Sequence, residues 1–123
     1  MSMSVEAYRN TAAFEHAMQA TLMDYLAIQY RYELYAFAIP NAGQRSPRIG
    51  KRMKDEGMRA GVADICVMLK GGKVIWVELK TAKGRLSPAQ KDFRLICRSL
   101  GHTYLLARSV SEAIDLLKAE GLR

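Results

Sequence analysis

Residues 74–80 read VIWVELK and place a glutamate and a lysine, two positions apart, in a segment that otherwise has the composition of a buried strand. Side chains alternate between the two faces of a strand, so Glu78 and Lys80 share one face while the apolar residues 75, 77 and 79 share the other. The apolar face can pack against a helix. The other face then presents a carboxylate and an ammonium group about 7 Å apart along the strand.

The segment ADICVML (63–69) is a second expected strand, joined to the first by the loop KGG (70–72). Directly paired residues of an antiparallel hairpin point to the same face. A loop of two glycines pairs Asp64 with Leu79 and places it on the apolar face, whereas a three-residue loop pairs it with Glu78. The last glycine of KGG can adopt the left-handed conformation that the three-residue loop needs.

Paired in this way, Asp64 and Glu78 have Cβ atoms about 5 Å apart, which is unfavourable for two carboxylates unless a positive charge lies between them. This pattern predicts a shared Mg²⁺ or Mn²⁺, whose bound water can become a nucleophile next to a phosphodiester. Lys80 can orient that water or offset charge that develops on the phosphate. The alternative is an ion pair between Glu78 and Lys80 on an exposed edge strand.

Glu15 lies in the middle of the apolar arc of a helix predicted over about 7–30. A glutamate there is either desolvated or faces a polar pocket, which predicts a third carboxylate for the metal or its water shell. The alternative is a position at a frayed helix edge. Gln90 is expected to form a capping box with Ser87, and its side-chain amide at a helix N-terminus is also well placed beside a phosphate.

The remaining segments predict one α/β domain over residues 1–123, with a mixed sheet of about four strands flanked by helices in the order α-β-β-β-α-β-α. Ser109 and Glu112 are expected to form a second capping box. The other expected elements are strands at 34–39 and 102–107, a short basic helix at 48–57, and helices over 88–100 and from 109 to about 121.

The formal net charge of +7 predicts a polyanionic partner, with nucleic acid as the first candidate. Basic residues gather before the hairpin and after the E-x-K strand; the candidates for DNA contact are Arg45, Arg48, Lys51, Arg52, Lys83 and Arg85. The alternative is a solvated basic face. The sequence also predicts a soluble cytoplasmic protein, without membrane contact and with Cys66 and Cys97 reduced, because it shows neither a long apolar span nor a signal peptide.

Five stretches follow one another in an order that resembles the VRR-NUC nucleases, a branch of the PD-(D/E)XK superfamily with small phage-encoded stand-alone members. They are FEHAMQATLMDYL, PNAGQRS, KDEGMRAGVADI, VIWVELKTAKGRLSPAQ and GHTYLLARSVSEAIDLL. The resemblance covers most of the chain and implies a PD-(D/E)XK nuclease core. It implies that Asp64 and Glu78 bind metal, that Lys80 is the catalytic lysine, that Glu15 is the acidic residue of the first helix, and that Gln90 helps to organise the site.

The resemblance also implies that Asn41 lies near the substrate, and it shows one departure, because Ala63 stands where the family commonly has proline. Similar members are homodimers that cut branched DNA such as Holliday junctions, which makes a homodimer in the cytoplasm of a bacterial host the expectation for a phage-encoded chain. We therefore expect a Mg²⁺- or Mn²⁺-dependent, structure-selective endodeoxyribonuclease. Two alternatives stay open: a nicking or end-processing nuclease without junction preference, and a non-catalytic DNA-binding module.

Overall fold

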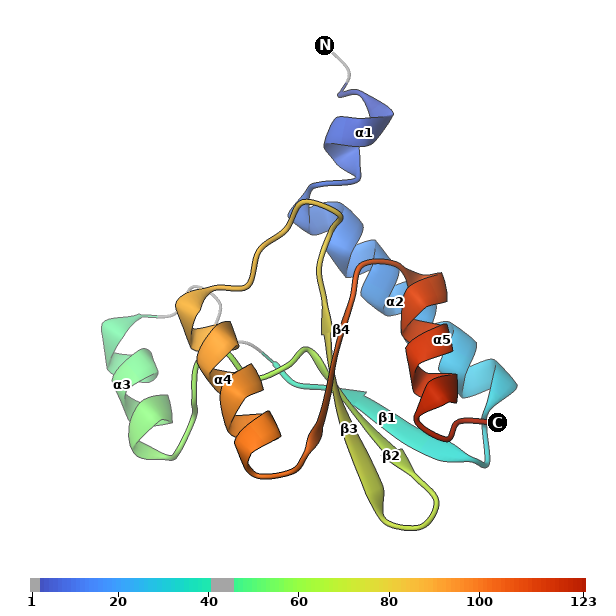
Figure 1. Cartoon of the computed structure of the whole chain (residues 1–123). Coiled ribbons are helices and arrows are strands. Elements are labelled where there is room, and N and C mark those ends of the chain that lie inside the picture. The colour runs from blue at the N-terminus through green and yellow to red at the C-terminus, as the bar shows by residue number, and fades with distance from the viewer. Residues whose placement is uncertain (1–2, 41–45) are drawn as a thin grey trace.

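The computed structural model describes residues 3–40 and 46–123. Helices and strands follow one another closely along the chain, and the second and third strands form a hairpin (Figure 1). In chain order they are α1 (Val5–Tyr8), α2 (Ala12–Gln29), β1 (Leu34–Ala38), α3 (Pro47–Asp55), β2 (Ile65–Leu69), β3 (Lys73–Leu79), α4 (Pro88–Ser99), β4 (Thr103–Ala107) and α5 (Val110–Ala119).

Within the described residues the strands form one four-stranded sheet in the order β1-β2-β3-β4. The pairs β1–β2 and β2–β3 are antiparallel, and β4 runs parallel to β3. The parallel step needs a crossover connection, and α4 supplies it. The predicted α/β class with a mixed sheet flanked by helices is confirmed.

The hairpin between β2 and β3 has the three-residue loop that places the two carboxylates on one face. Leu69 pairs with Lys73, and Ile65 pairs with Val77 at the other end of the ladder. Both loop glycines have positive φ angles, 84° at Gly71 and 81° at Gly72, a conformation that glycine adopts without steric cost. The next pair along this register is the predicted one of Asp64 and Glu78.

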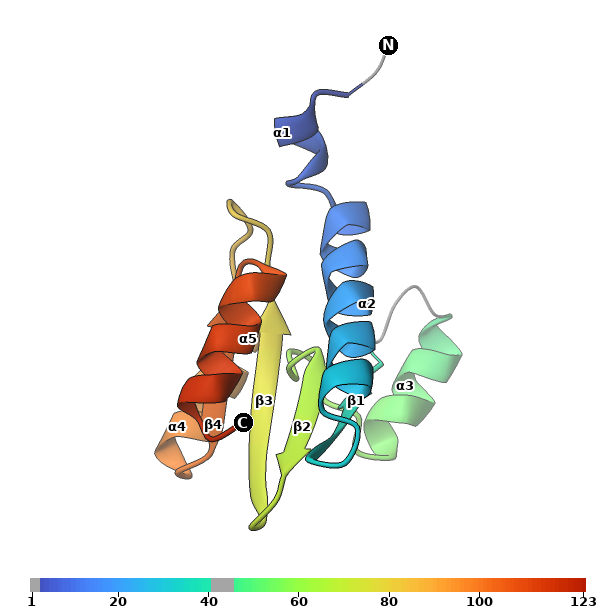
Figure 2. The same cartoon turned by 90° about the vertical axis from the view of Figure 1, so that its right-hand side faces the viewer.

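The sheet separates two apolar layers (Figures 1 and 2). The larger layer lies under α2 and α5, where Leu22 and Leu117 pack against strand residues such as Val77. The smaller layer lies under α4 and includes Cys97 and Tyr104. Because both layers cover the C-terminal part of β3, Glu78 near its end is buried.

The first predicted helix is interrupted at Thr11, which the apolar arc over 7–30 did not indicate. The Thr11 hydroxyl accepts a hydrogen bond of 3.2 Å from the backbone N–H of Phe14 and caps α2. A threonine that bonds the backbone in this way favours a helix start over a helix interior. The break places Glu15 in the first turn of α2, where a carboxylate also interacts favourably with the helix dipole.

The predicted capping box of α4 is confirmed, whereas that of α5 is wrong in one half. Ser109 accepts from the backbone N–H of Glu112, as predicted. The Glu112 carboxylate, however, accepts from the backbone N–H of Arg108 at 2.7 Å and not from that of Ser109. The side chain therefore reaches one residue further back, toward the end of β4.

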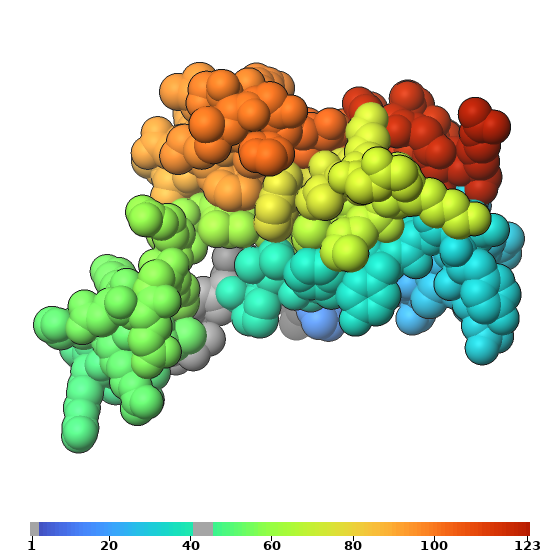
Figure 3. All heavy atoms as spheres, turned by 90° about the horizontal axis from the view of Figure 1, so that it is seen from below, coloured from blue at the N-terminus to red at the C-terminus, as the bar shows by residue number. Residues whose placement is uncertain are grey.

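Helix α3 projects from the rest of the molecule (Figure 3). It covers Pro47–Asp55, within two residues of the predicted 48–57, and Gly57 follows it with a φ of 101°. Cys66 and Cys97 are both buried free thiols. Across the two described ranges, no helix combines the length and the apolar character that crossing a membrane requires.

Candidate functional site

The candidate site lies where β3 ends, because the fold brings Asp64, Glu78 and Lys80 to the same edge of the sheet. Asp64 immediately precedes β2, and Glu78 is the penultimate residue of β3. One Asp64 carboxylate oxygen, Oδ2, accepts a hydrogen bond of 2.7 Å from the backbone N–H of Leu79. This bond holds the Asp64 side chain against β3 and leaves its other oxygen for a further partner.

Glu78 is a buried carboxyl group beside Asp64. The residue is 1% exposed, and no described group donates a hydrogen bond to either oxygen of the ionised carboxylate. Burial raises the pKa of Glu78 to about 9; the hydrogen bond that its protonated form makes to Asp64 and the charges of Asp64 and Glu15 act in the same direction, while Lys80 opposes them. A bare carboxylate in this position is costly, so the site favours either a proton or a cation.

Glu15 reaches the same cluster from the first turn of α2. Burial raises the pKa of Glu15, and the charge of Asp64 raises it further, while Lys80 and the backbone of Thr81 lower it. The helix start at Thr11 thus brings a third carboxylate to the edge of the sheet. Glu15 thus lies close enough to Asp64 for the charge of one carboxylate to affect the other.

The carboxylates nevertheless do not form a ready-made three-ligand centre. In the described part of the chain, no group of three or more His, Cys, Asp or Glu side chains is arranged to hold a metal ion. Glu15 lies near Asp64 and Glu78 but is not placed with them as a third ligand. The carboxylates of Asp64 and Glu78 still fit Mg²⁺ or Mn²⁺, because Mg²⁺ commonly binds one or two carboxylates and retains several waters.

Lys80 is fixed at its backbone and half-buried at its side chain. Its N–H donates to the carbonyl oxygen of Ala107, the last residue of β4, at 3.0 Å. Its charge lowers the pKa of both Glu15 and Glu78. Lys80 therefore provides positive charge beside the carboxylates, as the E-x-K spacing predicts.

Gln90 is held in the capping box of α4. Its Oε1 accepts from the backbone N–H of Ser87 at 2.8 Å, and the Ser87 hydroxyl accepts from the N–H of Gln90 at 3.2 Å. The helix start is pressed against the chain that leads to Asp64, since a Cβ on Gly61 would lie 2.3 Å from the carbonyl oxygen of Ala89. The side-chain NH₂ group of Gln90 takes no part in the box.

Ala63, which departs from the family's proline, is fully buried in the smaller layer and packs with Cys97 and Tyr104.

Tyr104 itself is a residue that sequence reasoning missed. It pairs with Trp76 in the parallel ladder, and the Tyr104 hydroxyl is buried without a partner in the described ranges. Burial and the charge of Glu78 raise the pKa of Tyr104, so this phenol borders the acidic cluster. Its position depends on the register of β3 and β4, which no local pattern specifies.

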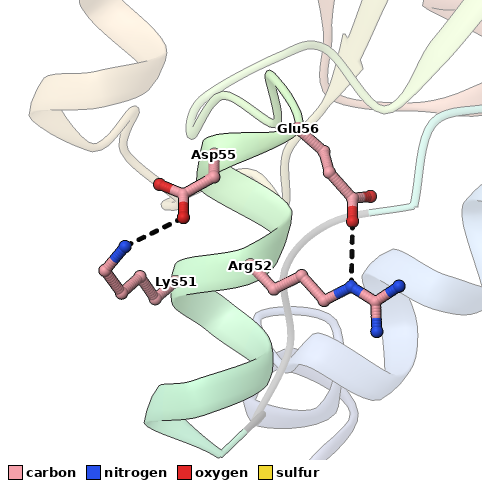
Figure 4. A network of polar contacts seen from close by, with 4 residues as sticks. All are labelled: Lys51, Arg52, Asp55 and Glu56. Carbon is pink, nitrogen blue, oxygen red and sulfur yellow. Dashed lines mark hydrogen bonds and ion pairs between the residues drawn. The ribbon is translucent and has the colours of Figure 1, made fainter.

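The predicted DNA-contact residues that the structure describes lie on α3 and on the segment between β3 and α4. On α3, Lys51 pairs with Asp55 at 2.9 Å and Arg52 pairs with Glu56 at 3.0 Å (Figure 4). All four side chains are well exposed, so each pair contributes only about 0.3–0.5 kcal/mol. Exchanging these partners for phosphates therefore costs little.

Of the other predicted contacts, three lie within the described residues. Arg48 is exposed on α3, and Arg85 is exposed before α4. Lys83 is also exposed, and its ammonium group lies 3.5 Å from Glu6. Asn41 and Arg45 lie outside the described residues.

A groove of about 680 Å³ lies between the α3 region and α4, and sequence reasoning missed it. Lys54 and Arg59 line it together with apolar residues that include Phe93 and Ile96. Both basic residues belong to the charged stretch before the hairpin, but only their placement opposite α4 makes them part of a groove. The groove adjoins the helix start that carries Gln90, since Ala89 also lines it.

The sequence matches no family model and no curated protein. Solved structures similar to this chain include the following two. One, described as a VRR_NUC domain protein, superimposes with a TM-score of 0.68 at 17% identity and covers 85% of each chain. The other, described as a VRR_NUC domain, gives a TM-score of 0.56 at 16% identity and covers 82% of this chain and 95% of its own. The expectation drawn from the sequence motifs thus agrees with an independent comparison of structures: the chain has the fold of the VRR-NUC domain.

Proposed function

We propose that the protein is a Mg²⁺- or Mn²⁺-dependent, structure-selective endodeoxyribonuclease that hydrolyses phosphodiesters in branched DNA such as Holliday junctions. The observation that carries the proposal is the buried carboxylate of Glu78, to which no described group donates a hydrogen bond when it is ionised; it lies beside Asp64 and two residues before Lys80. The VRR_NUC description of the two similar structures supports the same class of activity.

In this proposal Asp64 and Glu78 hold the cation, and Glu15 contributes to its water shell. When bound, Mg²⁺ or Mn²⁺ supplies Lewis-acid chemistry that activates water and polarises a phosphate oxygen. The Lys80 ammonium group stabilises the charge that grows on the phosphate or orients the attacking water. The Gln90 NH₂ group lies at the N-terminus of α4, where backbone N–H groups favour an anion, and helps to position the substrate.

In this proposal the protein binds DNA through electrostatic contacts and recognises the shape of the DNA, not its sequence. The predicted contacts are Asn41, Arg45, Arg48, Lys51, Arg52, Lys83 and Arg85, and the groove adds Lys54 and Arg59. Contacts from such residues to phosphates position a protein on DNA without reading its sequence. A net charge of +7 is consistent with this mode of recognition.

We also propose that the protein acts as a homodimer, in the cytoplasm of a bacterial host if the chain is phage-encoded. A near-symmetric four-way junction offers two equivalent strands, and a two-fold dimer offers two equivalent sites. The proposal therefore predicts paired cuts on opposing strands.

The test compares cleavage of a labelled four-way junction with that of a linear duplex of the same sequence, in Mg²⁺, in Mn²⁺ and in chelator. Glu78→Ala protein serves as the control for a contaminating nuclease. Metal-dependent cuts on two opposing strands of the junction, absent with the variant, are the expected result. Equal cutting of both substrates contradicts the junction preference, and binding without cutting moves the protein to the DNA-binding class.

A further inference from the structure

Arg108, the residue that follows β4, donates hydrogen bonds to the backbone of the segment after Lys80. Nη1 of Arg108 donates to the carbonyl oxygens of Thr81 and Gly84, each at 2.7 Å, and approaches that of Ala82 at 3.3 Å. The Arg108 guanidinium group thus contacts three backbone carbonyls within residues 81–84. Carbonyls that converge on one cation specify the path of a loop more tightly than a single hydrogen bond does.

The loop 81–84 also folds back on the lysine. The N–H of Gly84 donates to the carbonyl of Thr81 at 3.1 Å, and a Cβ on Gly84 would lie 3.5 Å from the Cβ of Lys80. Thr81 is buried, although the loop is otherwise largely exposed. The loop therefore passes close beside Lys80.

Arg108 and Lys80 are joined by a second route. The residue before Arg108, Ala107, accepts the backbone hydrogen bond of Lys80 at 3.0 Å. Arg108 is itself anchored, since its N–H donates to the Glu112 carboxylate at 2.7 Å. The end of β4 thus fixes Lys80 through its main chain and fixes the loop beyond it through the Arg108 side chain.

On its other side the loop meets the N-terminal segment. The backbone N–H of Lys83 donates to Oδ1 of Asn10 at 3.1 Å, and its ammonium group lies 3.5 Å from Glu6. Both are exposed contacts, whereas the bond from Arg108 to the Thr81 carbonyl is part-buried.

We propose that Arg108 is a positioning residue of the nuclease, whose guanidinium group fixes the loop 81–84 and thereby the placement of Lys80 against the scissile phosphate. The inference rests on the proposed function. Arg108 contacts no reacting atom; it acts through the loop. Its removal lowers the turnover number and leaves DNA affinity intact, because the misplacement of one catalytic group affects the transition state more than binding.

The test compares Arg108→Met, which keeps the aliphatic stem, with Lys118→Met, which removes one positive charge from an exposed position on α5. With Arg108→Met we expect kcat on the junction to fall roughly tenfold or more, KM and Kd to stay within about twofold, and amide hydrogen exchange at residues 80–84 to accelerate. The Lys118→Met protein should match the wild type in all of these.

Two results overturn the inference. One is an Arg108→Met protein with wild-type kcat. The other is a defect confined to Kd, with a salt dependence reduced by about one unit, which identifies Arg108 as a phosphate contact. Arg108→Lys keeps a cationic donor and should regain part of kcat and of the exchange protection. If Arg108→Met does not fold, Arg108→Lys is compared with the wild type and Lys118→Met instead. Failure of the proposed function looks different, since the wild-type protein itself then cuts no DNA.

Discussion

Asp64 accepts a hydrogen bond from the backbone N–H of Leu79, the residue that follows Glu78, at 2.7 Å. The bond ties one carboxylate of the candidate site to the strand that carries the other. It also gives Asp64 two separable roles, one in holding the hairpin end and one in binding a cation. Substitutions can separate them.

Asp64→Asn should keep the bond to Leu79, because an amide oxygen still accepts, and should abolish cleavage, because the charge is gone. Asp64→Ala should remove both the bond and the activity and reduce the free energy of unfolding by about 1–3 kcal/mol, since it leaves a buried N–H without a partner. Chemical unfolding and the junction assay measure the two effects. Equal destabilisation by both substitutions contradicts the structural role of this bond.

Metal-free protein should lose stability as the pH rises from about 5 to about 9, because the pKa of Glu78 is raised from 4.5 to about 9. In this window the folded protein keeps a proton that the unfolded chain has released, so raising the pH favours unfolding, by up to about 1.4 kcal/mol per pH unit. Glu78→Gln removes this group and should flatten the curve. Thermal melting in chelator tests it, and parallel curves for the two proteins would count against the raised pKa.

Gly61→Ala should destabilise the protein by roughly 2–5 kcal/mol, because the new Cβ would meet the Ala89 carbonyl at 2.3 Å and the φ of 84° strains any other residue. Gly57→Ala is the matched control. Its φ is 101°, but nothing lies within 4 Å of the added Cβ, so only backbone strain of about 1–2 kcal/mol is expected. Similar destabilisation of both variants would show that the loop before Asp64 does not press on α4.

The paired charges of α3 should bind phosphates. Replacing both Lys51 and Arg52 by methionine should weaken DNA binding and reduce its salt dependence by about one unit for each phosphate that the variant no longer binds. The free energy of unfolding should fall by less than about 1 kcal/mol. Asp55→Asn frees Lys51 from its partner and should strengthen binding. Titrations at several salt concentrations measure both effects on binding, and an unchanged slope in the double variant assigns these residues to a solvated face.

The sequence predicted the parts of the site that lie close together along the chain. The alternation of the two strands left two registers for Asp64, and the three-residue KGG loop places it opposite Glu78; the S-P-A-Q pattern predicted the cap at Gln90. These predictions succeeded because hairpin register and helix capping are set by a few neighbouring residues.

Contacts between distant segments were not predicted. The helix start at Thr11 competes with an apolar pattern that continues through it, so the position of Glu15 in a first turn was hidden. Tyr104 reaches the acidic cluster through parallel pairing across α4, and Arg108 reaches the loop after Lys80 through a turn that no spacing rule covers. In each case the tertiary arrangement decides the partner, and the local sequence is compatible with several.

The central claim is that Asp64 and Glu78 form a divalent-cation site, and Mn²⁺ binding measured by calorimetry tests it most directly. The wild-type protein should bind Mn²⁺ and release protons as it does so, because the Glu78 carboxyl must ionise to bind a metal. Glu78→Gln should abolish binding, and Glu15→Gln should retain it more weakly. Mn²⁺ binding of the same affinity by the wild type and Glu78→Gln would contradict the account.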